Sequence, residues 1–82
     1  MTRDEIRNVV ILALTRIAPE IDPQDLQADT VLRQDLDLDS MDFLNFVVGL
    51  HETLGVDIPE QDYPRLTTLN RAVDYLASRL AV

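Results

Sequence analysis

Apolar residues recur at helical spacing near both ends of the chain. Near the start they run from Ile6 to Ile17, and the segment Thr2-Arg3-Asp4-Glu5 before them has the form of a helix capping box. Pro19 should end this helix, because proline disrupts the hydrogen bonding of a helix interior. Near the other end, Thr67-Thr68 precedes a helix whose expected buried stripe is Leu69, Ala72, Val73, Leu76 and Leu80.

A middle helix is predicted from Asp39-Ser40 to Leu54, where Gly55 can adopt the left-handed conformation that ends many helices. On a helical wheel its apolar residues form two arcs, with Ser40 between them. The wider arc should face the core and contains Phe43, Phe46, Val47, Leu50 and Leu54. The second arc contains Met41, Leu44 and Val48. Either the preceding loop covers this second arc, or the arc is exposed and binds a partner.

The segments between these helices lack a regular period. Residues 19–39 form a predicted long loop, in which a short helical turn fits residues 22–26. Its isolated apolar residues should fix the loop to the core; they are Ile21, Leu26, Val31 and Leu32. After the middle helix, residues 60–66 can hold one or two helical turns, which Pro64 limits.

Length and composition predict one globular domain, residues 1–82. The chain has 46% apolar and 27% charged residues, no cysteine, and a single histidine, His51. This composition excludes disulfides, thiolate metal sites and multi-histidine metal centres. The longest early apolar run, Val9 to Leu14, is too short for a membrane span and follows acids rather than bases. We therefore expect a cytoplasmic protein.

The charge is strongly negative and unevenly distributed. Fifteen acids and seven bases, all arginine, give a net charge of −8, which argues against nucleic acid and anionic membranes as partners. Residues 20–42 contain eight of the acids and one base, Arg33. This concentration favours a protein partner with a basic patch.

The residues from Asp35 to Asp42 allow more than one interpretation. They can simply cap the middle helix through Asp39 or Ser40 and complement its dipole. Asp35, Asp37 and Asp39 also have the spacing of the first ligands in a calcium-binding loop. That interpretation fails, because Ser40 stands where such a loop needs glycine and Phe46 stands where it needs a bidentate glutamate.

The third interpretation is a resemblance to a known family. The sequence Asp35-Leu-Asp-Leu-Asp-Ser40-Met41 resembles the attachment motif of acyl carrier proteins, Asp-Leu-Gly-x-Asp-Ser-Leu/Met. Further on, Gly55-Val-Asp-Ile-Pro59 is similar to the segment after that family's second helix. Thr67-Thr-Leu69 and Ala72-Val-Asp-Tyr-Leu76 are similar to its last helix.

The resemblance implies an all-α fold, a small four-helix bundle with a long first loop and a short third helix. It implies that a phosphopantetheinyl transferase attaches 4′-phosphopantetheine to Ser40, that Asp39 presents this serine, and that the chain is not itself an enzyme. The arm would carry acyl groups between acyl-loading ligases or synthases with basic patches, and we expect a monomer. The implied partner-binding residues are Asp35, Asp37, Met41, Asp42, Leu44, Val48 and Glu52.

The sequence also departs from the family pattern. Asp37 replaces the usual glycine, which should change the loop and add charge, and Asn45 and His51 stand where acids are common. These differences suggest a specialised carrier in a lipid or secondary-metabolite pathway. We expect His51 to be solvated or to face a partner rather than to act in catalysis. The alternatives are a small acidic helical interaction module without a prosthetic group, and a divergent divalent-metal binder.

Overall fold

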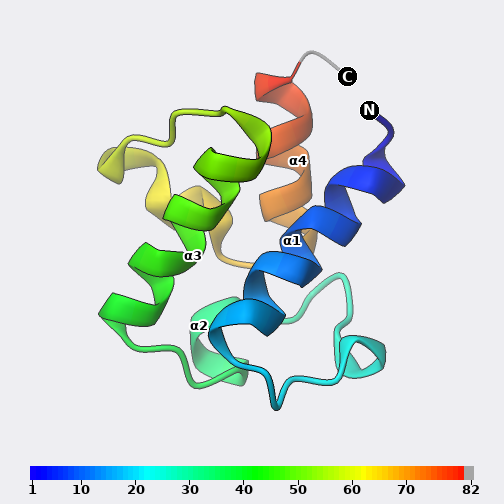
Figure 1. The fold of residues 1–82 in the computed structure, drawn as a ribbon, viewed down its shortest axis with the longest axis vertical. Coiled ribbons are helices and arrows are strands. Elements are labelled where there is room, and N and C mark those ends of the chain that lie inside the picture. Colours follow the sequence, from blue (N-terminus) through cyan, green and yellow to red (C-terminus); the bar gives the residue numbers. More distant parts are fainter. Residues whose placement is uncertain (81–82) are drawn as a thin grey trace.

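The computed structural model describes residues 1–80, which fold into a small bundle of helices (Figure 1). The long helices are α1 (Arg3–Ile17), α3 (Ser40–Leu54) and α4 (Leu69–Arg79), and α1 packs against both of the others. Between them lie the one-turn helix α2 (Leu32–Asp35) and two 3₁₀ segments, η1 (Pro23–Asp25) and η2 (Glu60–Leu66). The predicted helical bundle is confirmed, with η2 as its short third helix. No helix within residues 1–80 is both long and apolar enough to cross a membrane.

Helix α1 begins and ends where the sequence predicts. The Thr2 hydroxyl accepts a hydrogen bond from the Glu5 backbone N–H at 3.2 Å, and the Glu5 carboxylate accepts one from the Thr2 N–H at 2.8 Å. The hydrogen bond from the Thr2 backbone N–H is the largest cause that lowers the pKa of the Glu5 carboxyl. The capping box therefore satisfies two N–H groups that the first helical turn leaves without partners.

Helix α3 also has its predicted bounds, and Gly55 ends it with a φ of 68°. Phe43, Phe46, Val47 and Leu50 are buried as expected, whereas Leu54 is only partly buried. Gly49 faces α1 so closely that an added Cβ would lie 3.9 Å from the Cβ of Ala13. The small residues allow the two helices to pack closely and bury the core arc between them.

The second arc of α3 is exposed, so the loop does not cover it. The side chains of Met41, Leu44 and Val48 are 65%, 42% and 44% exposed. We call these three residues the apolar strip.

The first loop is tied to the core by buried leucines and to α4 by backbone hydrogen bonds. Leu26 and Leu32 are buried in the core, and the partly buried Ile21 packs against it, whereas Val31 is partly buried outside this cluster. The Leu32 N–H donates to the Thr67 carbonyl at 2.9 Å, and the Leu69 N–H donates to the Thr30 carbonyl at 3.1 Å. The sequence pattern predicted the turn at η1 but missed α2, because four residues are too few to show a helical period.

Helix α2 ends in a Schellman motif centred on Asp37. The Leu38 N–H donates to the Arg33 carbonyl at 2.8 Å, and the Asp37 N–H donates to the Gln34 carbonyl at 3.4 Å. This closure requires a left-handed residue, and Asp37 takes a φ of 55°. The position favours glycine because glycine has no Cβ to clash in that conformation. Aspartate adopts it more readily than most other residues do.

The segment η2 is held against α4 by polar contacts that the sequence pattern did not predict. The Tyr75 hydroxyl donates to Asp62 Oδ2 at 2.7 Å, and an Arg79 Nη donates to the same oxygen at 3.1 Å. The hydrogen bond from Tyr75 lowers the pKa of Asp62, and burial raises the pKa of Tyr75. On α4, Tyr75 and Ala77 join the expected buried stripe, whereas Leu80 is only partly buried.

The two arcs of α3 should respond differently to truncation. Leu50→Ala removes a side chain with no exposed surface and should lower the free energy of unfolding by about 2–5 kcal/mol. Val48→Ala should lower it by less than about 1 kcal/mol, because Val48 is substantially exposed. Urea unfolding of both variants measures the difference. Equal losses would show that the apolar strip is part of the core in solution.

Asp37→Gly should stabilise the fold by about 0.5–1 kcal/mol, because it removes both a left-handed non-glycine residue and one charge of the acidic segment. Asp37→Asn serves as the control, since it removes the charge and keeps a side chain that tolerates this conformation. Thermal unfolding at low and high salt separates the two contributions. The electrostatic part should shrink as salt rises, whereas the backbone part should not. If Asp37→Gly and Asp37→Asn gave the same melting temperature, backbone strain would contribute nothing.

Candidate functional site

Ser40 is the first residue of α3 and its side chain is exposed. The Asp39 carboxylate caps the helix by accepting a hydrogen bond from the Asp42 N–H at 2.8 Å. The Asp42 carboxylate in turn accepts a hydrogen bond from the Asp39 N–H at 3.3 Å. The N–H groups of the first helical turn have no acceptors within the helix, and they make this end the positive end of the helix dipole. Ser40 is thus a hydroxyl in open solvent beside a positive helix end.

Arg33 reaches Ser40 from the neighbouring helix α2. One of its Nη atoms donates to Ser40 Oγ at 3.3 Å, and its guanidinium carbon lies 5.7 Å from the centre of the Phe43 ring. In the sequence, Arg33 stands out only as the single base of an acidic segment. Its position as a lone base was the available signal of a special role. Its contact with Ser40, seven residues later, depends on the Schellman turn, which the sequence pattern did not predict.

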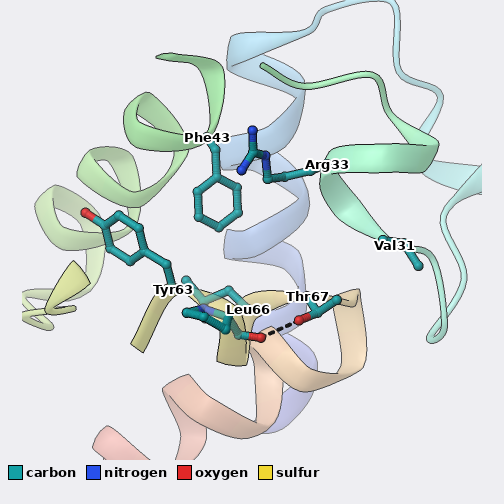
Figure 2. A pocket seen from close by; sticks show the side chains of 7 residues that line it. Val31, Arg33, Phe43, Tyr63, Leu66 and Thr67 are labelled. Carbon is teal, nitrogen blue, oxygen red and sulfur yellow. Dashed lines mark hydrogen bonds between the residues drawn. The ribbon is translucent and has the colours of Figure 1, made fainter. Parts of the chain in front are cut away.

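An apolar pocket of about 220 Å³ lies beside this contact, between α2, α3 and η2. Figure 2 shows Arg33 extending from α2 toward Phe43 on α3, with the Tyr63 ring of η2 nearby. The Phe43 and Tyr63 rings meet edge to face, with their centres 5.7 Å apart. The pocket is lined by Val31, Arg33, Phe43, Tyr63, Pro64, Leu66 and Thr67. The sequence pattern does not reveal this pocket, because its walls come from three separate elements.

The residues predicted to bind partners lie on two surfaces joined by the turn before Ser40. The apolar strip and Glu52 lie on an exposed face of α3. Asp35 and Asp37 instead line an open hollow with four acids of the first loop, Glu20, Asp22, Asp25 and Asp29. Asp42 is only partly exposed because it belongs to the cap of α3.

The acids around Ser40 do not converge on a common point. Asp35 accepts a hydrogen bond from the Val31 N–H at 2.8 Å, and Asp39 caps α3. Over residues 1–80, no three His, Cys, Asp or Glu side chains are grouped so that they could hold a metal ion. The site therefore lacks the ligand arrangement of a calcium loop.

His51 lies eleven residues after Ser40, about 16 Å along the helix axis. Its Nδ1 is 3.2 Å from the Val56 carbonyl oxygen and 3.2 Å from Asp57 Oδ1. The histidine thus contacts the segment that follows Gly55 and is far from the serine.

These features suit a phosphate ester on Ser40. The hydroxyl is accessible, the helix end and the Arg33 guanidinium both favour an anion, and the pocket beside them is apolar. Phosphopantetheine combines a phosphate, which would be esterified to the serine, with a thiol that can carry an apolar chain. The residues present therefore fit this group.

Comparisons with known proteins agree with this chemistry. Residues 8–76 match the sequence model of a family described as "Phosphopantetheine attachment site". The chain is 36% identical over 78 residues to the acyl carrier protein of Lactobacillus johnsonii, a match that covers 95% of this chain and 96% of the relative. It is 32% identical over 76 residues to the acyl carrier protein of Rubrobacter xylanophilus, covering 93% of each.

The fold is similar as well. The structure of the acyl carrier protein from Enterococcus faecalis superposes with a TM-score of 0.81 at 28% identity, covering 96% of this chain and 99% of that one. Sequence and fold lead to the same conclusion: this chain belongs to the acyl carrier protein family, whose prosthetic group is phosphopantetheine.

Proposed function

We propose that this chain is an acyl carrier whose Ser40 receives 4′-phosphopantetheine from coenzyme A through a phosphopantetheinyl transferase. The observation that carries the proposal is the exposed Ser40 hydroxyl at the start of α3, within the residues that match the attachment-site family. When bound, the group supplies a terminal thiol on a flexible arm, which holds acyl cargo as thioesters. The apolar pocket, which Arg33 lines together with Phe43 and Tyr63, favours apolar cargo.

Asp39 would present Ser40 to the transferase by fixing the start of the helix. Its side chain is engaged in the cap of α3, so the backbone of residue 40 is held in place while the hydroxyl stays exposed. The transferase, and not this chain, would activate the serine for the reaction. Arg33, which contacts Ser40 Oγ, offers only N–H donors and no acceptor atom, so it cannot take up the hydroxyl proton. We accordingly propose that the chain is a carrier and not itself an enzyme.

The apolar strip and the predicted acids on both surfaces would bind partner enzymes. The strip supplies apolar contact area beside Ser40, and the charged residues Asp35, Asp37, Asp42 and Glu52 would attract basic patches and speed association. Helix α3 itself carries only two acids, Asp42 and Glu52, and its other polar residues are Ser40, Asn45, His51 and Thr53. This distribution supports a specialised carrier, in a lipid or secondary-metabolite pathway, with its own ligases or synthases.

We further propose that residues 1–82 form a single acyl-carrier domain. The buried residues form one core cluster that runs from Ile6 on α1 to Ala77 on α4. The family match spans almost the same range. A cytoplasmic location stays a prediction from the sequence.

Incubation with coenzyme A and a broad-specificity transferase should add one phosphopantetheine to the chain. Intact mass measures the addition, and peptide mapping should place it on Ser40. Ser40→Ala should fold normally, because the side chain is exposed, and should take up none. Ser78→Ala is the matched control, since it removes the other serine and should leave uptake unchanged. If the wild type stayed unmodified while a known carrier was loaded, the chain would be better described as an interaction module.

Truncation of the apolar strip should impair modification without impairing the fold. Met41→Ala and Val48→Ala should each lower the kcat/KM of the transferase by about five- to thirtyfold, as expected for a residue worth about 1–2 kcal/mol in an interface. Leu12→Ala is the control, because Leu12 on α1 is similarly exposed at 49% but lies outside the strip. If all three variants reacted like the wild type, the transferase would not use the strip.

A further inference from the structure

Arg33 is the single base among the eight acids of residues 20–42, and the fold places it next to Ser40. Its position is fixed by the backbone. The Arg33 carbonyl accepts the closing hydrogen bond of the Schellman motif from Leu38 at 2.8 Å, and the adjacent Leu32 is fully buried. The helix that carries Arg33 is therefore held in place by the burial of Leu32 and by the hydrogen bond to the turn that leads to Ser40.

The guanidinium of Arg33 is held by two contacts. An Nη atom donates to Ser40 Oγ at 3.3 Å, and the group lies over the Phe43 ring at 5.7 Å, where a cation is attracted by the π electrons. The contact with the Phe43 ring lies on the pocket side of α3, because Phe43 and Arg33 both line the apolar pocket (Figure 2). The remaining N–H groups of the guanidinium are available to a further acceptor.

We propose that Arg33 is the cation that binds the phosphodiester of the prosthetic group, an inference that rests on the proposed modification of Ser40. The phosphorus of that ester is bonded to Oγ, the atom that Arg33 already contacts, so the charged phosphate oxygens lie within reach of the same guanidinium. Arginine suits this role because its planar fork of donors matches phosphate oxygens.

The charges around the site explain why such a cation matters. A phosphodiester adds a negative charge beside Asp37, Asp39 and Asp42, in a segment that already repels itself. Arg33 would offset this repulsion. Because it acts from the Phe43 side, it would also direct the base of the arm toward the mouth of the pocket and leave the apolar strip free for partners.

The test is a thermodynamic double cycle in which the modification of Ser40 and the residue at position 33 are each varied. Unmodified and fully modified protein are prepared for the wild type, Arg33→Gln and Arg71→Gln, and each sample is verified by intact mass. The measurement is the melting temperature of the modified form minus that of the unmodified form. Arg71→Gln is the matched control, since Arg71 is an exposed arginine on α4.

We expect this difference to be about 2–5 °C lower in Arg33→Gln than in the wild type, the size that an exposed ion pair gives in a small domain. Arg71→Gln should match the wild type, and the effect should shrink in 0.5 M salt. Arg33→Lys, which keeps the charge without the planar fork, should fall between the two. The NMR resonance of the Arg33 Nε–H should also shift when the wild type is modified.

An equal difference in Arg33→Gln and the wild type, or an unshifted Arg33 resonance, would overturn the role of Arg33. The melting-temperature difference and the Arg33 resonance shift are both measured only on protein whose intact mass shows the added phosphopantetheine. A failure of the proposed modification would instead appear as an unchanged mass, so the two failures are distinguishable.

Discussion

Burial of Leu38 fixes the relation between α2 and α3, and the geometry of the site depends on it. Leu38 is 6% exposed, and its N–H closes the end of α2 by binding the Arg33 carbonyl. The next residue, Asp39, begins the cap of α3. The buried Leu38 thus lies directly between the hydrogen-bonded end of α2 and the capped start of α3, and it holds these two helix ends close together. Ser40 is exposed at the start of α3, and Arg33 contacts it across this hydrogen-bonded turn.

The acids near the serine serve the fold as well as the surface. Asp35 binds the Val31 N–H, and Asp39 and Asp42 satisfy each other's backbone groups at the start of α3. Each of these bonds to a charged acceptor stabilises a short or exposed helix start. The same carboxylates leave a field of negative charge around Ser40. The same acids can therefore stabilise the helix starts and attract a basic partner. They also repel one another, and we infer that the nearby Arg33 offsets part of this repulsion.

The wall of the pocket opposite α3 is built from a segment with weak helical tendency. Pro64 interrupts regular hydrogen bonding in η2, which forms a 3₁₀ helix rather than an α-helix. The bonds among Asp62, Tyr75 and Arg79 hold this segment on α4, and the Tyr63 ring then contacts Phe43 across the pocket. This wall of the pocket is thus set by packing between elements rather than by the helical propensity of η2 itself.

The sequence alone determined the bounds of α1 and α3, their caps, and which arc of α3 faces the core. These features are local, since apolar spacing and capping residues act within one or two turns. The motif around Ser40 also indicated the family. The tertiary structure decided the rest: the helix α2, the left-handed turn at Asp37, the pocket, and the contact of Arg33 with Ser40. Each of these depends on residues that are distant in the chain, or on a backbone conformation that no periodic pattern encodes. They form only when burial of the loop leucines makes one packing of the loop more stable than the alternatives.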